Sequence, residues 1–331
     1  MYFTLPSSLR IGVVRGGPSP EYDVSLKTGS NVLKELSVTH RPIDIFISRD
    51  GTWHMRGVPK TPDRILKHVD VVFNALHGTY GEDGRIQEIF DHYGIPYSGS
   101  GKLSSAISMN KFMTKECITQ AGIKTPLSVL VRTTDNVPTS IRNVFSLLPM
   151  PVIIKPVTGG SSVGITIAHT KEELVDAIET ILQSENDVLV EEYIKGREAT
   201  CGVVNNMRGQ NVYALPVVEI IPPKKSDEPN QFFDYDAKYS GQSREICPGN
   251  FSIAEKKEIE RISSEVHSIL SLDGYSRSDF IVTPRRGIYF LEVNTLPGLT
   301  SESLLPKSLE AVGIKFQEFL HHILGLALER K

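Results

Sequence analysis

YSRSDFIVTPRRGIYFLEVN, residues 275–294, contains two runs rich in aromatic and β-branched residues on either side of Thr-Pro-Arg-Arg. Such runs around a short polar turn predict a β-hairpin. We expect Arg285 and Arg286 at the centre of the turn, flanked by Pro284 and Gly287. This turn determines which residues of the two strands lie opposite each other.

Four polar side chains then share one face of the hairpin, because side chains alternate between faces along a strand. Asp279 lies opposite Glu292, and Arg277 lies opposite Asn294. Two carboxylates and an amide make an oxygen-rich site suited to Mg²⁺. Two alternatives stay open: a solvent-facing polar hairpin, and a register displaced by one residue, because the apolar residues do not all fall on the other face. The apolar residues concerned are Phe280, Val282, Ile288, Phe290 and Leu291.

The segment that follows the hairpin, NTLPGLTSESL (294–304), is polar and contains glycine. A loop of this kind can present backbone N–H groups to an oxyanion or a carboxylate. The hairpin and the loop together favour a reaction centre near the C-terminus.

The composition is that of an ordinary globular protein of 331 residues, with 40% hydrophobic and 23% charged residues. A formal net charge of −3, without basic or acidic tails, argues against a nucleic-acid partner. The N-terminus lacks a secretory pattern, and no run approaches the roughly 18 apolar residues that span a bilayer, so we expect a cytoplasmic chain without a membrane partner. Cys117, Cys201 and Cys247 are odd in number and far apart, which favours free thiols in a reducing compartment.

Three sections with different patterns predict three domains, at residues 1–103, 104–197 and 198–331. The first section alternates strands and helices, which favours an open, mostly parallel α/β sheet with ligand loops at the strand ends. Two such loops are RGGPSPEYDVS (15–25) and HGTYGEDG (77–84). The other two sections have the pattern of α+β domains.

The second section begins with one expected helix, SSAISMNKFMTKECITQAG, that ends at Gly122. The strands PVIIKP (151–156) and GITIA (164–168) flank the loop GGSSVG (159–164). In the third section a long polar stretch at 222–245 contains several aromatic residues. A loop of that length inside a compact domain is usually functional or disordered.

ATP requires cations and backbone donors around its phosphates. The chain has no GxxxxGK[ST] motif, and GGSSVG joins two strands, so we interpret it either as a flap over phosphates or as a plain hairpin turn. Lys155 lies in an apolar strand, where a lysine needs an anion. Lys111 and Lys238 are further candidates, and a solvated surface position is the alternative for each lysine. Glu191 and Glu198, at and after the end of the strand VLVEEYI, are candidates for contacts with adenine and ribose, or exposed carboxylates.

Taken together, these motifs resemble the ATP-grasp superfamily and, within it, the D-alanine–D-alanine ligase family. The resemblance covers nearly the whole chain and rests on eight segments in order: RGGPSPEYDVSLKTG (15–29), ALHGTYGEDGRIQ (75–87), GIPYSGSG (94–101), VIIKPVTGGSSVG (152–164), VLVEEYIKGRE (188–198), FFDYDAKY (232–239), SRSDF (276–280) and LEVNTLPGLTSESLLPK (291–307). It implies an ATP-grasp architecture, with an open parallel α/β domain followed by two α+β domains that clamp ATP. It also implies that D-alanine is phosphorylated to an acyl phosphate, which a second D-alanine attacks.

The resemblance implies roles for individual residues. Catalytic roles fall to Glu21, Ser161, Tyr239, Arg277 and the backbone of Gly298. Substrate contacts fall to His77, Ser303 and Leu304. ATP contacts fall to Lys111, Lys155, Ser162, Glu191, Glu192, Tyr193, Ile194, Glu198 and Lys238. Two Mg²⁺ ions, which Mn²⁺ can replace, fall to Asp279, Glu292 and Asn294. A homodimer is also implied.

The sequence departs from the family pattern at Asn110, where aspartate is usual, at Ser278, where an apolar residue is usual, and in the insertion PPKKSDEPN (222–230). Tyr239 and Leu304 favour D-alanine over D-lactate or D-serine as the acceptor. Two other functions stay open: an ATP-grasp ligase for a different amino acid, and a non-catalytic nucleotide-binding module. The set of polar residues on the hairpin argues against the second.

Overall fold

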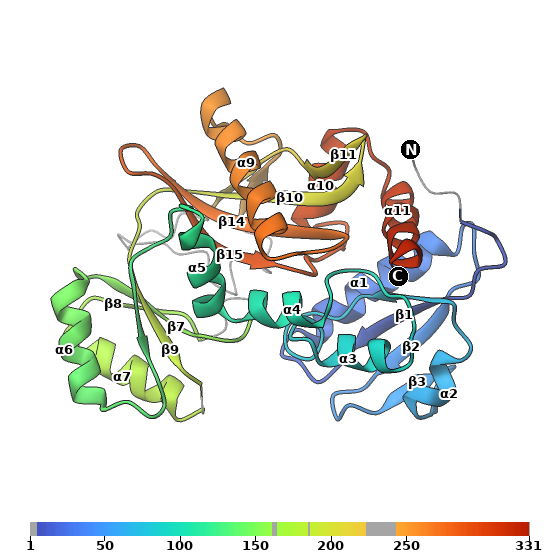
Figure 1. Ribbon diagram of the computed structural model, residues 1–331, viewed down its shortest axis with the longest axis horizontal. Helices are drawn as coiled ribbons and strands as arrows, with labels where there is room; N and C mark the ends of the chain where they lie inside the picture. The colour runs from blue at the N-terminus through green and yellow to red at the C-terminus, as the bar shows by residue number, and fades with distance from the viewer. Residues whose placement is uncertain (1–4, 161–163, 185, 223–242, 331) are drawn as a thin grey trace.

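The computed structural model describes residues 5–330 except 161–163, 185 and 223–242. Its described part consists of three β-sheets with helices packed on them (Figure 1). The predicted residues Ser161, Ser162, Lys238 and Tyr239 lie outside the described residues. Of the helices in the described part, none is both long enough and apolar enough to cross a membrane.

The first sheet has the strand order β4-β3-β2-β1-β5. Strand β1 pairs in parallel with β2 and β5, whereas β3 and β4 add antiparallel strands at one edge. The elements are β1 (Ile11–Gly16), α1 (Tyr22–Leu36), β2 (Ile43–Ile47), β3 (Trp53–Met55), β4 (Val58–Pro59), α2 (Pro62–Leu66), β5 (Val71–Asn74) and α3 (Arg85–His92). The parallel strands β2, β1 and β5 agree with the predicted α/β pattern, and the loops after β1 and β5 leave the sheet on the same side.

The second sheet is antiparallel, with the order β6-β9-β7-β8, and two helices cover one of its faces (Figure 1). Its elements are β6 (Ser128–Val131), α6 (Val137–Leu147), β7 (Val152–Pro156), β8 (Thr166–Ala168), α7 (Lys171–Leu182) and β9 (Val188–Glu192). Apolar residues of both helices and of the sheet form one buried cluster. The Gly/Ser segment after β7 connects two antiparallel strands, as predicted.

The third sheet has the order β13-β12-β10-β14-β15, with β11 paired to β10. Its elements are β10 (Arg197–Met207), β11 (Gln210–Ala214), β12 (Val218–Ile221), β13 (Arg244–Ile246), α9 (Ile253–Ile269), β14 (Tyr275–Thr283), β15 (Gly287–Asn294), α10 (Leu304–Ala311) and α11 (Phe316–Glu329). The hairpin β14–β15 is therefore packed at the edge of a larger sheet rather than standing alone.

The single helix predicted from Ser104 is wrong, because the segment forms two helices, α4 (Lys102–Met109) and α5 (Lys111–Gln120). Asn110 lies between them with extended backbone angles, and its side chain accepts a hydrogen bond from Met113 N at 2.9 Å. An asparagine in this position caps the second helix, which explains the break.

Two buried clusters join sections that are distant in the sequence. Ile11 and Phe73 of the first sheet pack in one cluster with Phe319 of α11. Ile118 of α5 packs in another with Ile259 of α9 and with the apolar face of the hairpin. The C-terminal helix therefore joins the first and third sheets, and α5 packs on the third sheet.

Candidate active site

A cavity of about 1190 Å³ lies where the three sheets meet. Fifteen of the residues predicted for the site line this cavity: Glu21, His77, Lys155, Glu191, Glu192, Tyr193, Ile194, Glu198, Arg277, Asp279, Glu292, Asn294, Gly298, Ser303 and Leu304. These residues come from the N-cap of α1, the β5–α3 loop, β7, β9 and the segment after it, β10, the hairpin, the loop after it and the start of α10. The fold thus brings together side chains that are up to 283 positions apart.

The hairpin has the predicted register at the cavity. Arg277 pairs with Asn294, and Asp279 pairs with Glu292. The predicted turn is wrong: Thr283, not Pro284, pairs with Gly287, and a β-bulge after Asp279 compensates for the difference. The bulge leaves Leu291 without a cross-strand partner in the ladder, which accounts for the apolar residue that did not fit the alternation.

Asp279 is held by three neighbours. The guanidinium of Arg277 donates to both of its carboxylate oxygens at 2.9 Å, through Nε and Nη2. Thr200 Oγ1, from β10, donates to Oδ1 at 2.6 Å. Asn294 Nδ2 lies 3.4 Å from Oδ2. This arrangement fixes the orientation of the carboxylate and of the guanidinium toward the cavity.

The donor set on this face suits a hard cation such as Mg²⁺ or Mn²⁺. Asp279 and Glu292 face each other across the hairpin, and Asn294 adds an amide oxygen beside them. Across the described residues, no group of three or more His, Cys, Asp or Glu side chains is placed to hold a metal on its own. A magnesium site of this kind would therefore need substrate phosphates and water as its remaining ligands, which is the coordination that Mg²⁺ prefers.

The Glu21 carboxylate lies against two glycine loops. A Cβ atom at Gly78 would lie 2.3 Å from Glu21 Oε2, and one at Gly160 would lie 2.9 Å from the same oxygen. Gly78 also has a φ of 68°, which favours glycine. The loop after β5 and the loop after β7 can approach Glu21 only because neither position carries a side chain. The loop after β5, which carries His77, and the loop after β7 therefore meet at the carboxylate of Glu21.

The loop that carries Gly298 is fixed by side chains of the first section. His77 Nδ1 lies 2.8 Å from the carbonyl of Leu296, and His77 Nε2 lies 2.8 Å from Thr28 Oγ1. A carbonyl only accepts, so Nδ1 carries the proton and Nε2 accepts from Thr28. Burial lowers the pKa of His77 to about 4, so the ring is neutral at pH 7. His77 therefore lines the cavity and also connects α1 to the loop that carries Gly298.

Glu82, which was not among the predicted site residues, holds the same loop. Its carboxylate accepts from Gly78 N at 2.8 Å and from Leu296 N at 2.9 Å, with Thr295 Oγ1 at 3.3 Å. Burial raises the pKa of Glu82, and these donors oppose the effect. A carboxylate in the glycine-rich loop after strand β5 was the available sequence signal.

Downstream, the loop turns back on itself before α10. Thr300 N donates to Ser303 Oγ at 3.0 Å, and a Cβ at Gly298 would lie 2.9 Å from that oxygen. Leu304 is buried with Val218 and Ile220. Gly298 N–H, the Ser303 hydroxyl and an apolar wall thus lie at one end of the cavity.

Two lysines and one glutamate lie together beside the cavity, where Lys155 and Glu191 line it and Lys115 does not. Glu191 Oε1 pairs with Lys115 at 2.6 Å, and Oε2 pairs with Lys155 at 2.8 Å. Burial alone would raise the pKa of Glu191, but the two lysines lower it below its ordinary value. Lys155 has the anion that a buried lysine needs, although Lys115 was not predicted to take part.

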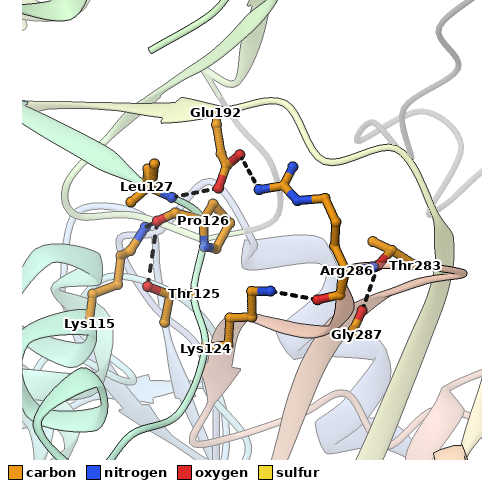
Figure 2. Close-up of polar contacts among 9 residues, drawn as sticks. All are labelled: Lys115, Lys124, Thr125, Pro126, Leu127, Glu192, Thr283, Arg286 and Gly287. Carbon is orange, nitrogen blue, oxygen red and sulfur yellow. Dashed lines mark hydrogen bonds and ion pairs between the residues drawn. The ribbon is translucent and has the colours of Figure 1, made fainter. Parts of the chain in front are cut away.

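Other predicted ATP contacts are spread around this wall. Lys111 Nζ donates to the carbonyl of Gly159 at 2.6 Å, next to the part of the Gly/Ser loop outside the described residues. Ile194 packs on Ile281 and Tyr289 of the hairpin. Glu192 binds Arg286 at 2.7 Å and the backbone N–H of Leu127 at 3.0 Å, as Figure 2 shows. Glu192 therefore ties β9 to the tip of the hairpin.

Comparison with known proteins identifies the family of the chain. Two family models match, D-ala D-ala ligase N-terminus at residues 54–100 and D-ala D-ala ligase C-terminus at residues 117–325. The chain is 37% identical to the D-alanine–D-alanine ligase of Syntrophobacter fumaroxidans, covering 97% of this chain and 98% of that protein. It is 38% identical to the D-alanine–D-alanine ligase of Geobacter sulfurreducens, covering 95% of this chain and 93% of that protein.

Solved structures give the same result. The VanG D-Ala:D-Ser ligase of Enterococcus faecalis superposes with a TM-score of 0.83 at 33% identity, covering 96% of this chain and 99% of that one. The D-alanine–D-alanine ligase of Bacillus anthracis complexed with ATP gives a TM-score of 0.77 at 31% identity, covering 98% of both chains. On the matched models, the full-length relatives and the shared fold, this chain belongs to the D-alanine–D-alanine ligase family.

Proposed function

We propose that this chain joins two D-alanine molecules into D-alanyl-D-alanine, consuming ATP and releasing ADP and phosphate, to supply a precursor of peptidoglycan. The observation that carries the proposal is the approach of Glu21 to Gly78 and Gly160, in a cavity that also receives the polar face of the hairpin. One anionic group is thereby presented at the end of the cavity where an ammonium would bind. Family membership supplies the reaction class.

In the proposed mechanism, Glu21 binds the ammonium of the first D-alanine and directs its carboxylate toward the hairpin. The γ-phosphoryl group of ATP passes to that carboxylate, which gives an acyl phosphate and ADP. The amine of the second D-alanine attacks the acyl carbon, and phosphate leaves. Arg277 and the N–H of Gly298 stabilise the oxyanion that forms during this attack, which is the usual largest electrostatic contribution in acyl transfer.

The remaining residues position the substrates. Ser303 and the N-terminus of α10 would receive the carboxylate of the second D-alanine, and buried Leu304 would contact its methyl group. Asp279, Glu292 and Asn294 would hold Mg²⁺, two ions in our proposal, and Mn²⁺ would substitute. When bound, the metal neutralises charge on the β- and γ-phosphates.

We also propose that the three domains have the boundaries expected from the sequence, at residues 1–103, 104–197 and 198–331. A cytoplasmic location is supported by the three free cysteines, because such thiols are typical of a reducing compartment. A homodimer is proposed on family grounds, and light scattering of the purified chain would test it.

The acceptor is the part of the proposal that a direct assay can decide. Purified chain with ATP and Mg²⁺ would be given D-alanine alone, and then D-alanine with D-serine or D-lactate. We expect ADP release with D-alanine alone, with D-alanyl-D-alanine as the product by mass spectrometry. Faster product formation with D-serine or D-lactate, or with an L-amino acid, would replace D-alanine as the proposed acceptor.

A further inference from the structure

The buried wall at β9 contains one more cation than anion. Lys115 and Lys155 share the single carboxylate of Glu191, each bound to a different oxygen. The side chains of the three residues are at most 6% exposed. The neighbouring carboxylate does not change this balance, because Glu192 is bound to Arg286 and to the backbone of Leu127 (Figure 2). The triad therefore has a net charge of about +1 in a wall with little access to water.

The two lysines differ in position. Lys155 and Glu191 line the cavity, whereas Lys115 lies behind them on α5. Lys115 Nζ also donates to the carbonyl of Pro126 at 2.7 Å, in the segment that leads into the second sheet (Figure 2). The carbonyl fixes the lysine from one side and Glu191 fixes it from the other. Lys155 is thus the lysine that can turn toward a ligand in the cavity. Lys115 is the lysine that remains bound to Glu191 and to the carbonyl of Pro126.

A buried carboxylate that loses its only counter-ion is strongly destabilised. If Lys155 were the sole partner of Glu191, moving its ammonium to a phosphate would leave that carboxylate uncompensated. Lys115 removes this cost, because Glu191 keeps one short ion pair after Lys155 departs. The same arrangement prevents Glu191 from neutralising Lys155 completely.

We propose that Lys115 is a positioning residue of the nucleotide site, which remains the counter-ion of Glu191 and thereby makes Lys155 available to the triphosphate. The proposal rests on the proposed function, since it assumes that the cavity binds ATP. It assigns a role to a residue on α5 that does not itself line the cavity. It also predicts that anion affinity follows the net charge of the triad.

The test compares four forms of the full chain: wild type, Lys115→Met, Glu191→Gln and the double variant Lys115→Met/Glu191→Gln. Titration calorimetry would measure the affinity of each for ATP and for tripolyphosphate in one Mg²⁺-containing buffer. Tripolyphosphate isolates the anion contribution, because it has no base for Glu191 to contact. Lys257→Met, on the exposed side of α9, is the matched control for the loss of a lysine.

Lys115→Met leaves a neutral pair of Lys155 and Glu191. We therefore expect this variant to bind tripolyphosphate and ATP at least about tenfold more weakly than wild type does. The double variant restores the net charge of +1, so its tripolyphosphate affinity should return to within about threefold of wild type. If Lys115 had a purely structural role, the double variant would bind tripolyphosphate no better than Lys115→Met does, because a second buried substitution would not restore binding. Lys257→Met should bind both probes as wild type does.

The outcomes separate this inference from the function on which it rests. Wild type that binds neither ATP nor tripolyphosphate contradicts the proposed function and the inference together. Wild type that binds both, with Lys115→Met equally tight, contradicts the inference alone. If Lys115→Met does not fold, as judged by thermal unfolding, the double variant decides: tripolyphosphate binding more than about tenfold weaker than wild type overturns the proposal.

Discussion

The hairpin β14–β15 and the wall at β9 contribute charged groups to the same cavity, but they are built in different ways. On the hairpin, Arg277 and Asp279 are two positions apart and 16% and 17% exposed. In the wall, Lys115 and Glu191 are 76 positions apart and at most 6% exposed. The hairpin is a local structure whose geometry follows from alternation and a turn. The wall exists only after α5, β7 and β9 have packed together.

This difference predicts where substitutions act. Charges on the hairpin face the cavity and should affect chemistry more than folding. Charges that connect distant segments should hold the reacting groups in position, and their removal should also lower the free energy of unfolding. The largest effect is expected at the hairpin, and the smallest at a helix cap outside the cavity.

The first substitution, Glu292→Ala, removes a proposed metal ligand from the hairpin. We expect phosphate release to fall by about a thousandfold or more, because the charge on the β- and γ-phosphates is no longer neutralised. The temperature of unfolding should change little, since the side chain faces the cavity. Steady-state phosphate release would be compared with Glu310→Ala, which removes an exposed glutamate from α10. Turnover near the wild-type rate in Glu292→Ala would refute the metal assignment.

The second substitution, Glu82→Gln, acts at a distance through the loop that carries Gly298. A glutamine side chain has one acceptor oxygen where glutamate has two. The backbone N–H of either Gly78 or Leu296 therefore loses its partner. A small displacement of a catalytic group can cost about a hundredfold in rate, so we expect kcat to fall by tens to about a hundredfold.

For Glu82→Gln, the KM for ATP is the discriminating measurement. It should stay within about twofold of wild type, since the lost contacts lie at the acyl end of the cavity. Glu88→Gln on the following helix α3, where the glutamate is exposed and paired with Lys102, is the control. Equal kinetics of Glu82→Gln and Glu88→Gln would exclude a positioning role for Glu82.

The third prediction concerns pH and His77. Burial lowers its pKa to about 4 in the folded chain, below the ordinary value of 6.5. Between these values the unfolded chain binds a proton that the folded chain does not, so acid destabilises the fold. The stability that His77 contributes is complete above about pH 6.5 and is lost as the pH falls toward 4, by about 3 kcal/mol.

Urea unfolding at several values between pH 7 and pH 4 would measure this dependence. The free energy of unfolding of wild type should fall more steeply toward acid than that of His77→Gln. Burial also lowers the pKa of His267 to about 4, but His267 is present in both chains and cancels in the comparison. Parallel slopes for the two chains would show that His77 is not buried in its neutral form.

The smallest expected effect is at Asn110, between α4 and α5. Replacing this N-cap by alanine should lower the free energy of unfolding by about 1 kcal/mol, because Met113 N loses its acceptor. Asn110→Asp keeps an acceptor at the same place and should match wild type. Chemical denaturation of the three chains would check both expectations, and equal stability of all three would remove the capping role.

The sequence was sufficient for the elements whose pattern is local. Alternation along 275–294 predicted the pairing of Asp279 with Glu292, although the turn was predicted one residue too short and the bulge was missed. Strand β9 also lies within the expected strand VLVEEYI. The break at Asn110 was missed because apolar residues continue across it, while the cap is a single hydrogen bond.

The sequence was insufficient where the site depends on packing between sections. Thr200 binds Asp279 from a strand 79 positions away, and no periodicity predicts which strand becomes the neighbour of β14. Lys115 lies four residues after Lys111 in the same helix, where it could as well have been solvated. Glu82 stood in a loop already recognised, but its partners at 295 and 296 come from the other end of the chain.

Manganese binding to the hairpin is the most direct test of the account. Electron paramagnetic resonance would count the Mn²⁺ ions bound per chain in the presence of a non-hydrolysable ATP analogue, for wild type, Asp279→Asn and Glu292→Ala. We predict two ions for wild type and loss of at least one ion in each variant, with nucleotide still bound. Two ions in both variants, at wild-type affinity, would contradict the claim that this hairpin is the metal site.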